Sequence, residues 1–349
     1  MVVDLTVAIP TYNGARRLPE VLDRLRMACQ DASLVMPHSP QTPQASYSHR
    51  FNWEVMVVDN NSTDDTAKIV QAYQANWPAQ CPLTYCFEPQ QGAAFARRRA
   101  FIEAKGELVG FLDDDNIPEP DWVAAAYAFA REHPKAGAYG SRIRGEFEVT
   151  PPENFHRLTP FLAITERGSQ PRCYEPQHRV LPPSAGLVVR KSAWLESVPS
   201  HLVLSGRTPG SMLTGEDLEM LAHIQAKGWE IWYNPAMQIT HKIPHWRLKR
   251  EYLIPFFRGI GLSRHVTRML GVKPWQRPIA TLAYMANDVR KIVFHVLKYG
   301  LSVRSDLIAA CEMQLFISSL ASPFYLWSHG YFERHNQSSL PGGVSSHPE

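Results

Sequence analysis

A cluster of three consecutive carboxylates directly follows the apolar run at residues 108–112. Its members are Asp113, Asp114 and Asp115. Adjacent carboxylates repel one another, so a loop that holds three of them needs a helix N-terminus, arginine side chains or a divalent cation for compensation. Acidic residues in such loops are often helix caps. Here two prolines precede the next helical pattern, which predicts that this acidic triplet lies at the end of a strand, where open α/β sheets bind ligands.

Polar loops of the same kind follow three earlier β-type runs. They read PTYNG at residues 10–14, VVDNNSTDD at residues 57–65 and EPQQGAAFARRRA at residues 88–100. The carboxyl ends of parallel strands meet at one edge of a sheet, so these loops are expected to form one polar rim. Such a rim suits the binding of a nucleotide.

The elements that must position these loops are read from hydrophobic periodicity. The runs LTVAIP, WEVMVVD, LTYCFE and ELVGFL alternate with helical patterns, which predicts an α/β fold with a mostly parallel sheet. Further on, SAGLVVRKSAW predicts a strand, GEDLEMLAHIQAKGW a helix, and EIWYNPAMQITHK one long strand or a strand pair. We predict a catalytic domain at 1–250, a helical extension at 251–335 and a disordered tail at 336–349.

Composition excludes several classes of protein. With 36 basic and 33 acidic residues in 349, the net charge of +3 gives no global attraction to nucleic acid. Five scattered cysteines argue against a disulfide framework and a zinc site. The N-terminus lacks the apolar core of a signal peptide, so we expect a cytoplasmic protein. The apolar stretch at 308–327 contains Glu312, Gln314 and Pro323, which favours a buried or interfacial helix over a membrane span.

The four loops, in this order and spacing, resemble the nucleotide-binding half of the family-two inverting glycosyltransferases with the GT-A fold. That family carries an opening P-x-Y-N, an Asp after the second strand, a G-x-x-x-A-R-N helix and a D-x-D. Each motif alone is weak, but the set is specific and spans residues 7 to about 242. The resemblance implies a GT-A-like, mostly parallel sheet flanked by helices, with an α-helical C-terminal extension. It also implies transfer of a sugar from a nucleotide donor, expected to be a UDP-sugar, to a hydroxyl of a saccharide or lipid-linked acceptor in polysaccharide biosynthesis.

The donor's diphosphate gains charge as the glycosidic bond breaks, and a hard divalent cation neutralises it with few protein ligands. We therefore expect Mn²⁺ or Mg²⁺. By resemblance, Asp115 is the direct metal ligand, Asp113 holds the ribose or reaches the metal through water, and Asp114 is the variable middle residue. Asp59 resembles the acid that reads the base, although an Asx-turn is an alternative. The other donor-side residues implied by resemblance are Pro10, Thr11, Tyr12, Asn13, Arg97 near the diphosphate, and His241 at the metal or diphosphate. Arg98 stands where the family has Asn.

An inverting transfer also needs one general base for the acceptor hydroxyl. The stretch TGEDLEM supplies Glu216 and Asp217 at a helix start, and it resembles the family's E-D motif with Asp217 in the base position. An ordinary capping acid is the alternative. The stretch PHWRLKREY lacks the Q-x-x-R-W order of processive members, which favours single or few transfers.

Two other functions fit parts of the sequence. A sugar-phosphate nucleotidyltransferase needs a Gly-rich phosphate loop, but PTYNGARRL holds a single glycine. A non-catalytic carbohydrate-binding subunit of a polysaccharide assembly would not need both Asp115 and Asp217. The aromatic and basic stretch from Lys273 to Leu301 suits an anionic membrane at the inner face of the plasma membrane, although burial against the core is equally compatible. The loops between Gly145 and Ser211 hold no motif that would identify the sugar, the acceptor or the linkage.

Overall fold

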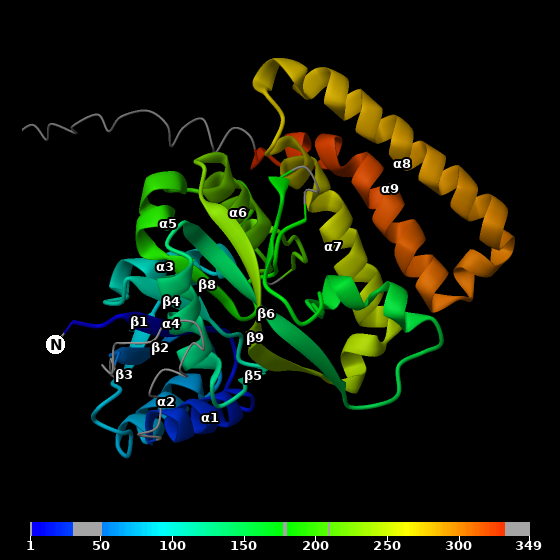
Figure 1. The fold of residues 1–349 in the computed structure, drawn as a ribbon. Helices are drawn as coiled ribbons and strands as arrows, with labels where there is room; N and C mark the ends of the chain where they lie inside the picture. The colour runs from blue at the N-terminus through cyan, green and yellow to red at the C-terminus, as the bar shows by residue number, and fades with distance from the viewer. Residues whose placement is uncertain (1, 31–50, 177–179, 209, 332–349) are drawn as a thin grey trace, which may run out of the picture. The chain divides into compact units, whose positions relative to one another are not determined.

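The computed structural model describes residues 2–30, 51–176, 180–208 and 210–331 (Figure 1). The chain divides into two compact units. The sheet unit comprises Met1–Ser197 and Met220–Leu253, and the helical unit comprises Val198–Glu219 and Ile254–Glu349. The tail predicted at 336–349 lies outside the described residues.

The sheet unit is built on one mixed sheet with strand order β3-β2-β1-β4-β8-β6-β9-β5, and β7 pairs with β9 at one side. The strands are β1 Leu5–Thr11, β2 Trp53–Asp59, β3 Leu83–Phe87, β4 Leu108–Phe111, β5 Asn116–Pro118, β6 Ala136–Phe147, β7 Arg172–Cys173, β8 Leu187–Arg190 and β9 Glu230–Ile243. β1 is parallel to β2 and β4, and β2 is parallel to β3. The predicted α/β architecture is confirmed.

The second half of the sheet departs from a purely parallel pattern. β8 runs antiparallel to both β4 and β6, whereas β6 and β9 are parallel and β5 is antiparallel to β9. The run SAGLVVRKSAW contributes only the strand β8, because helix α5 begins at Lys191. EIWYNPAMQITHK forms one long strand, not a pair of strands.

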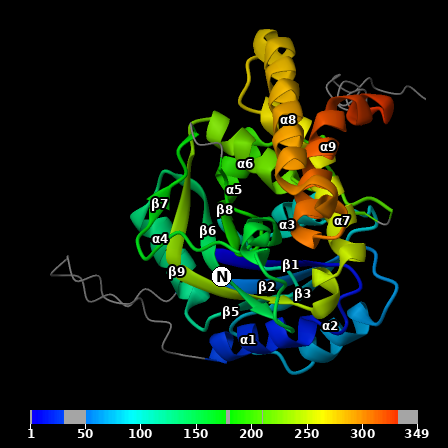
Figure 2. The same cartoon turned by 90° about the vertical axis from the view of Figure 1, so that its right-hand side faces the viewer.

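Helices cover both faces of the sheet. They are α1 Leu18–Gln30, α2 Thr66–Gln74, α3 Ala93–Glu103, α4 Trp122–Glu132, α5 Lys191–Ser197 and α6 Glu216–Ala226, the last of which begins in the helical unit. Figure 2 shows α1 and α2 on one side of the first strands and α3 and α5 on the other. Alternate strand residues serve the two faces: Val7 belongs to the core with α1 and α4, whereas Phe111 contacts Phe101 of α3.

A glycine in β4 fixes how α4 approaches the sheet. A Cβ on Gly110 would lie 2.9 Å from the ring of Trp122, so only glycine leaves room for this buried indole. Trp122 in turn donates from Nε1 to Ser141 Oγ at 2.9 Å, and Ser141 Oγ donates to the Gly186 carbonyl at 2.6 Å. These bonds hold the Trp122 indole over Gly110, and β4, which precedes the acidic triplet, is paired with β1 on one side and β8 on the other.

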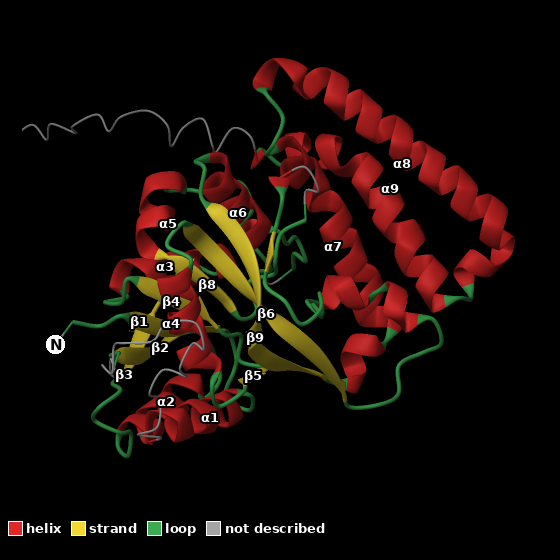
Figure 3. Ribbon diagram, viewed as in Figure 1, coloured by secondary structure: helices red, strands yellow, loops and turns green. Residues whose placement is uncertain are grey.

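The described part of residues 254–331 is helical (Figure 3). It contains α7 Arg250–Met269, whose first four residues belong to the sheet unit, α8 Arg277–Tyr299 and α9 Leu307–Ser328. Arg268 of α7 forms a two-pronged ion pair with the buried Asp288 of α8. His295 of α8 donates from Nε2 to the Ala309 carbonyl of α9 at 2.9 Å. Of the described helices, α9 alone is long and apolar enough to cross a membrane, and nearly half of its most apolar window is buried.

An apolar stripe runs along the solvent-exposed side of α8. Its members recur every three or four residues, as one face of a helix requires, and they are Ile279, Leu282, Ala286, Val289, Val293 and Val296. Residues 271–305 carry six cations, Lys273, Arg277, Arg290, Lys291, Lys298 and Arg304. The one acid in this range, Asp288, is buried in the ion pair with Arg268. The α8 stripe is therefore apolar and belongs to a segment rich in basic residues.

The loop that precedes α6 is fastened inside the helical unit. A Cβ on Gly259 would lie 1.9 Å from the Met212 carbonyl oxygen, so the α7 backbone and the loop backbone are in direct contact at this glycine. Thr214 donates its backbone N–H to Ser263 Oγ at 3.1 Å. The buried Glu219 carboxylate accepts the backbone N–H groups of Val203 at 2.8 Å and Leu204 at 2.9 Å.

This buried carboxylate gives the fold a pH dependence. Burial raises the pKa of Glu219 to about 7 with help from the neighbouring Glu216, against the two N–H donors, which lower it. A raised carboxyl pKa means that the folded protein binds more protons than the unfolded chain between about pH 4.5 and 7, so stability falls as pH rises through this window. Glu219→Gln cannot ionise, and its free energy of unfolding should lack this fall of roughly 2–3 kcal/mol between pH 5 and 8. Urea denaturation at several pH values measures it.

The matched control for Glu219→Gln is Glu103→Gln, which removes a half-exposed carboxylate paired with Arg99. That variant should keep the wild-type pH dependence. Equal slopes for wild type and Glu219→Gln would contradict the assignment.

Candidate active site

The acidic triplet lies at the carboxyl end of β4, as the sequence predicts. A tight turn connects it to β5: Asn116 donates its backbone N–H to the Asp113 carbonyl at 3.0 Å, and its Oδ1 accepts the Asp113 N–H at 3.2 Å. Helix α4 begins six residues later at Trp122. The three carboxylates are therefore held by a strand and a turn and are not caps of α4.

The Asp114 carboxylate is held from the first loop of the chain. Arg17 donates to it from Nε at 2.7 Å and from Nη2 at 2.9 Å, and Thr11 Oγ1 donates at 2.6 Å. A Cβ on Gly14 would lie 2.0 Å from Thr11 Oγ1 and 2.7 Å from Asp114 Oδ2, which explains the glycine of PTYNG. The pKa of Arg17 is raised, first by its hydrogen bond to Asp114 and by the charges of that acid and of Asp115.

The Asp113 carboxylate faces helix α3. Arg97 is buried, and its Nη2 lies 3.7 Å from Asp113 Oδ1 and donates to Ser184 Oγ at 2.7 Å. Arg98 is exposed, and Arg99 pairs with Glu103 at 3.0 Å on the outer side of the helix. Of the three arginines in this run, Arg97 is therefore the one that the helix directs towards the acidic triplet.

The Asp115 carboxylate is buried and contacts residues from the C-terminal end of the sheet unit. Arg247 donates from Nη2 to Asp115 Oδ2 at 2.8 Å, His241 Nε2 lies 3.6 Å from the same oxygen, and Asn116 donates from Nδ2 to Oδ1 at 3.1 Å. Burial alone would raise the pKa of the Asp115 carboxyl, but its charged neighbours, the guanidiniums of Arg247 and Arg17 among them, lower it well below its usual value. Asp115 therefore carries a negative charge throughout the physiological range.

Strand pairing brings these residues together. In the antiparallel β5–β9 pair, Asn116 is the register partner of His241, and Lys242 donates its backbone N–H to the Asp115 carbonyl at 3.0 Å. A short strand of three residues is thus enough to set the Asp115 carboxylate beside the His241 ring.

The imidazole of His241 has the tautomer of a metal ligand. A carbonyl oxygen can only accept, so Nδ1, which lies 2.9 Å from the Leu162 carbonyl, carries the proton. A guanidinium can only donate, so Nε2, which lies 3.1 Å from Arg247 Nη1, presents a lone pair. A carboxylate oxygen and an imidazole lone pair therefore converge on one cation, and the cation present is the guanidinium of Arg247.

These groups fit a divalent cation that takes few ligands from protein. Among the described residues, no group of three or more His, Cys, Asp and Glu side chains is arranged to hold a metal ion. Asp115 and His241 offer two candidate ligand atoms, and Mg²⁺ or Mn²⁺ in proteins typically keeps its other positions for water and phosphate oxygens.

The first two loops are joined to each other beside this site. Asn13 adopts a left-handed φ of 50°, donates its N–H to Ser62 Oγ at 2.9 Å and accepts the Thr63 N–H on Oδ1 at 2.8 Å. Pro10 lies within β1, and the Tyr12 side chain is exposed at the rim. The loop predicted to bind the donor is therefore rigid in its backbone and has one exposed aromatic ring.

The buried Asp59 ends β2 and uses both carboxylate oxygens. Oδ1 accepts the backbone N–H of Ser62 at 2.9 Å, and Oδ2 accepts the hydroxyl of Tyr85 at 2.8 Å. The first contact closes a local turn three residues on, whereas the Asx-turn that the sequence left as an alternative bonds the residue two positions on. Burial and the bond to Asp59 raise the pKa of Tyr85 to about 12, so this hydroxyl remains a donor. The role of Asp59 in reading a base stays a prediction.

Glu216 and Asp217 begin α6 in the helical unit. Glu216 is buried and accepts the Gly215 N–H on Oε2 at 3.0 Å, whereas Asp217 is half-buried and accepts the Leu218 N–H on Oδ1 at 2.9 Å. The more accessible carboxylate of the pair is thus Asp217. Its role as a base stays a prediction.

Sequence reasoning missed three residues of the site: Arg17, Ser184 and Arg247. Arg17 is in the stretch PTYNGARRL, where two arginines follow the motif. Helical periodicity does not show which of the two side chains contacts the acidic triplet. Arg247 is in PHWRLKREY, a stretch without the Q-x-x-R-W order of processive members and without another motif. The pairing of β5 with β9, which gives Arg247 its meaning, has no local sequence signal.

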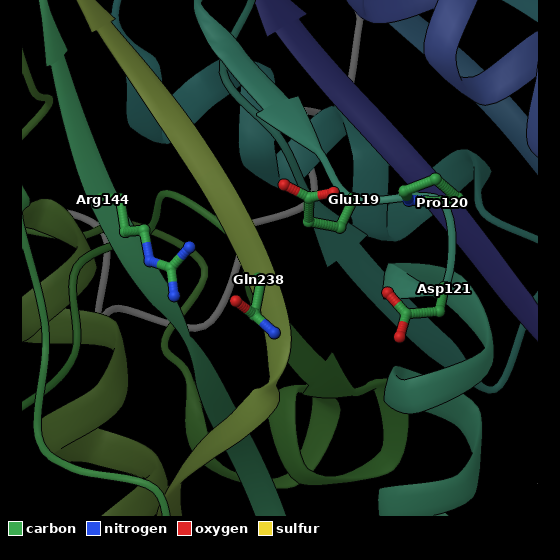
Figure 4. Close-up of a pocket in the computed structure, with 5 residues that line it drawn as sticks. All are labelled: Glu119, Pro120, Asp121, Arg144 and Gln238. Atoms are coloured by element: carbon green, nitrogen blue, oxygen red, sulfur yellow. The ribbon is translucent and has the colours of Figure 1, made fainter.

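A hollow of about 480 Å³ lies elsewhere on the sheet unit and is drawn in Figure 4. It is lined by Glu119, Pro120, Asp121, Arg144 and Gln238. Two carboxylates stand against one guanidinium, and none of the residues predicted for the site lines it. We assign it no ligand.

Comparison with known proteins identifies the fold. The family model described as "Glycosyl transferase family 2" matches residues 6–194, more than half of the chain. A solved structure, the mannosyltransferase PcManGT from Pyrobaculum calidifontis in complex with GDP-Man and Mn²⁺, is 20% identical, with a TM-score of 0.50 over 92% of this chain and 87% of that chain. At that identity the likeness shows the GT-A fold.

Several curated relatives match part of the chain. The glucosyl-dolichyl phosphate glucuronosyltransferase of Haloferax volcanii is 23% identical over 192 residues, 54% of this chain and 59% of that protein. The undecaprenyl-phosphate 4-deoxy-4-formamido-L-arabinose transferase of Pseudomonas savastanoi is 30% identical over 129 residues, 37% of this chain and 33% of that protein. The poly(ribitol-phosphate) beta-N-acetylglucosaminyltransferase TarS of Staphylococcus aureus is 30% identical over 128 residues, which are 37% of this chain and 19% of that protein. The chain thus spans less than two thirds of each relative.

The ion pair of Arg17 with Asp114 should contribute measurably to stability. Arg17→Gln removes the two-pronged partner of Asp114, whose nearly buried carboxylate lies between those of Asp113 and Asp115. Solvent reaches 42% of the Arg17 side chain. We expect the free energy of unfolding to fall by about 1–2 kcal/mol after allowance for this screening. The neighbouring exposed Arg16 is the matched control, and Arg16→Gln should change it by less than about 0.5 kcal/mol. Urea denaturation compares them, and equal effects of the two substitutions would contradict the assigned role.

Proposed function

Because the chain belongs to glycosyl transferase family 2 and is a glycosyltransferase, we propose that it transfers a sugar from a UDP-sugar, with inversion, to a hydroxyl of a saccharide or lipid-linked acceptor. The product would serve polysaccharide biosynthesis. One observation carries the proposal: a buried, ionised Asp115 and the His241 lone pair converge on a cation at the carboxyl end of β4.

The sheet unit would hold the donor. Arg97 lies against the acidic triplet in a position to bind phosphate oxygens, and Asp59 would accept from a uracil N3–H next to its turn contact. The exposed Tyr12 and the joined loops at Asn13 and Ser62 would shape the nucleoside side of the site. Asp113 would reach the ribose or a metal-bound water.

Asp115 and His241 would hold Mn²⁺ or Mg²⁺, with Asp113 in support. When bound, the cation would neutralise the charge that develops on the leaving nucleoside diphosphate. The Leu162 carbonyl would orient the metal ligand, because it fixes the proton of His241 on Nδ1 and keeps the lone pair on Nε2.

The acceptor side would be served by the start of α6. The acceptor oxygen attacks the anomeric carbon as the bond to the diphosphate breaks, and Asp217 would take the hydroxyl proton during this step. Glu216 is buried and bonded to the Gly215 N–H, so it would brace the turn before the helix.

The assignment of Asp217 predicts a particular kinetic defect. Asp217→Asn should reduce turnover by roughly 10²- to 10⁴-fold and leave donor affinity nearly unchanged, because a base acts on the acceptor and not on the donor. Glu216→Gln, the matched control, should cost less. The donor is first identified as the sugar nucleotide that raises the melting temperature with Mn²⁺ present. Transfer is then followed by release of nucleoside diphosphate.

Two results would contradict the role of Asp217. Near-normal turnover of Asp217→Asn would move the base elsewhere, with Glu216 the next candidate. Loss of donor binding would instead make Asp217 part of the donor site.

The helical unit would work at the inner face of the plasma membrane. The α8 stripe has exposed aliphatic side chains and residues 271–305 carry six cations, a combination that suits the headgroup layer of an anionic bilayer. A second copy of the chain fits less well, because the same basic residues would face one another. Dolichyl and undecaprenyl phosphates appear in the names of two relatives, and an acceptor of that class would lie in a membrane.

Two substitutions on α8, one in the α8 stripe and one at the exposed Leu297, test this location. Leu282 and Leu297 are 68% and 76% exposed, and their joint replacement by Glu should weaken sedimentation with phosphatidylglycerol vesicles at least about tenfold at unchanged melting temperature. Leu195→Glu, at a leucine 63% exposed on α5, is the matched control and should bind like wild type. Wild-type protein that never sediments at low salt would refute the membrane location. A change of oligomeric state in the double variant would instead assign the α8 stripe to self-association.

A further inference from the structure

Arg247 occupies the place that the proposed metal ion would need. Its Nη2 lies 2.8 Å from Asp115 Oδ2, and its Nη1 lies 3.1 Å from His241 Nε2. One guanidinium therefore uses both the carboxylate oxygen and the imidazole lone pair. Arginine keeps its proton under all physiological conditions, so this cation leaves the site only by movement of the side chain.

Simultaneous occupation by Arg247 and a divalent cation is excluded by charge and by lone pairs. The Nε2 atom has one lone pair, and it cannot accept from a guanidinium and coordinate a metal at the same time. A divalent cation beside the guanidinium would also meet strong repulsion in a site where the Arg247 and Asp115 side chains are only 14% and 10% exposed. Binding of a metal to Asp115 and His241 therefore requires that Arg247 be released.

The surroundings of Arg247 allow such a release. The residue lies on the short 3-10 segment His245–Leu248 that follows β9, outside the ladder of the sheet. Its Nε is buried and has no hydrogen-bond partner among the described residues, so the guanidinium satisfies only part of its donor capacity in this position. The half-exposed ring of Trp246 lies 5.4 Å from Arg247 Cζ and offers a face on which the planar group can rest.

We infer that Arg247 is an exchangeable counter-cation of the donor site: Asp115 exchanges the guanidinium for a divalent cation, and the released guanidinium then binds the donor's diphosphate. This inference rests on the proposed function, because it requires a metal-bound nucleotide donor. A fork of N–H donors matches phosphate oxygens in two-pronged geometry, so Arg247 changes from a ligand competitor into a donor-binding residue. The exchange also prevents Asp115 from being left as an unpaired buried charge in the absence of metal.

Opposite effects on two ligands test the exchange. Without nucleotide, Arg247→Gln should bind Mn²⁺ about tenfold more tightly than wild type, because its competitor for Asp115 and His241 is gone. At saturating Mn²⁺, the same variant should bind UDP about tenfold more weakly, because a diphosphate ligand is lost. Free Mn²⁺ is measured by electron paramagnetic resonance, and UDP binding by isothermal titration calorimetry.

Three further variants sharpen the result. Arg247→Lys keeps the charge without the fork and should lie between wild type and Arg247→Gln for both ligands. Arg99→Gln removes a cation that pairs with Glu103 on the outer side of α3, and it should leave both affinities unchanged. Asp115→Asn should abolish tight Mn²⁺ binding. Melting temperatures show which variants are folded, and Arg247→Lys serves if Arg247→Gln is not.

Mn²⁺ affinity that is unchanged or weaker in Arg247→Gln would overturn the inference, as would the absence of Mn²⁺ binding in both proteins. Tighter Mn²⁺ binding with unchanged UDP affinity would also overturn it, since the second half of the exchange would be missing. Failure of the wild type to bind UDP would count against the proposed donor, whereas the Mn²⁺ measurement decides independently whether Arg247 competes for Asp115.

Discussion

Three neighbouring carboxylates can occupy one short loop only if positive groups stand against each of them, and this requirement organises the sheet unit. The partners of residues 113–115 come from three separate parts of the chain: Arg17 after β1, Arg97 in α3 and Arg247 after β9. Each arginine is delivered by the packing of its own element on the sheet. The acidic triplet is therefore the point at which the first loop, the third helix and the last strand are tied together.

The same pairing leaves the site close to electrical balance before any ligand arrives. Three carboxylates meet three guanidiniums, and the His241 ring is neutral by its hydrogen bonds. A nucleoside diphosphate and a divalent cation that entered together would bring charges of opposite sign, so the balance would be preserved on binding. A diphosphate alone or a cation alone would disturb it, which gives a physical reason to expect that the two ligands support each other's binding.

The sequence predicted the parts of this arrangement that depend on local pattern. Apolar runs followed by polar loops placed the acidic triplet at the end of β4, and two prolines separated it from α4. The glycine of PTYNG and the helix that carries Arg97 were likewise predicted from the sequence.

The contacts between residues far apart in the sequence were not predicted. β5 has only three residues and pairs with β9 more than a hundred residues later. No hydrophobic periodicity in the sequence therefore indicates that His241 and Arg247 contact Asp115. Arg17 could not be told from Arg16, because both lie in the turn before α1 and no local pattern shows which of them faces the acidic triplet.

The strand order has a consequence for how the protein comes into being on the ribosome. Domains fold from the N-terminus as they are synthesised, and β1, β2, β3 and β4 can associate as soon as residue 111 has emerged. Arg17 and Arg97 are then already available, so Asp114 and Asp113 find their partners early. Among the described strands, β5 pairs with β9 alone, and β9 is the last of them to be made. Until residue 247 has been translated, the nascent chain carries Asp115 without its arginine, and closure of the sheet and neutralisation of this carboxylate become one late event.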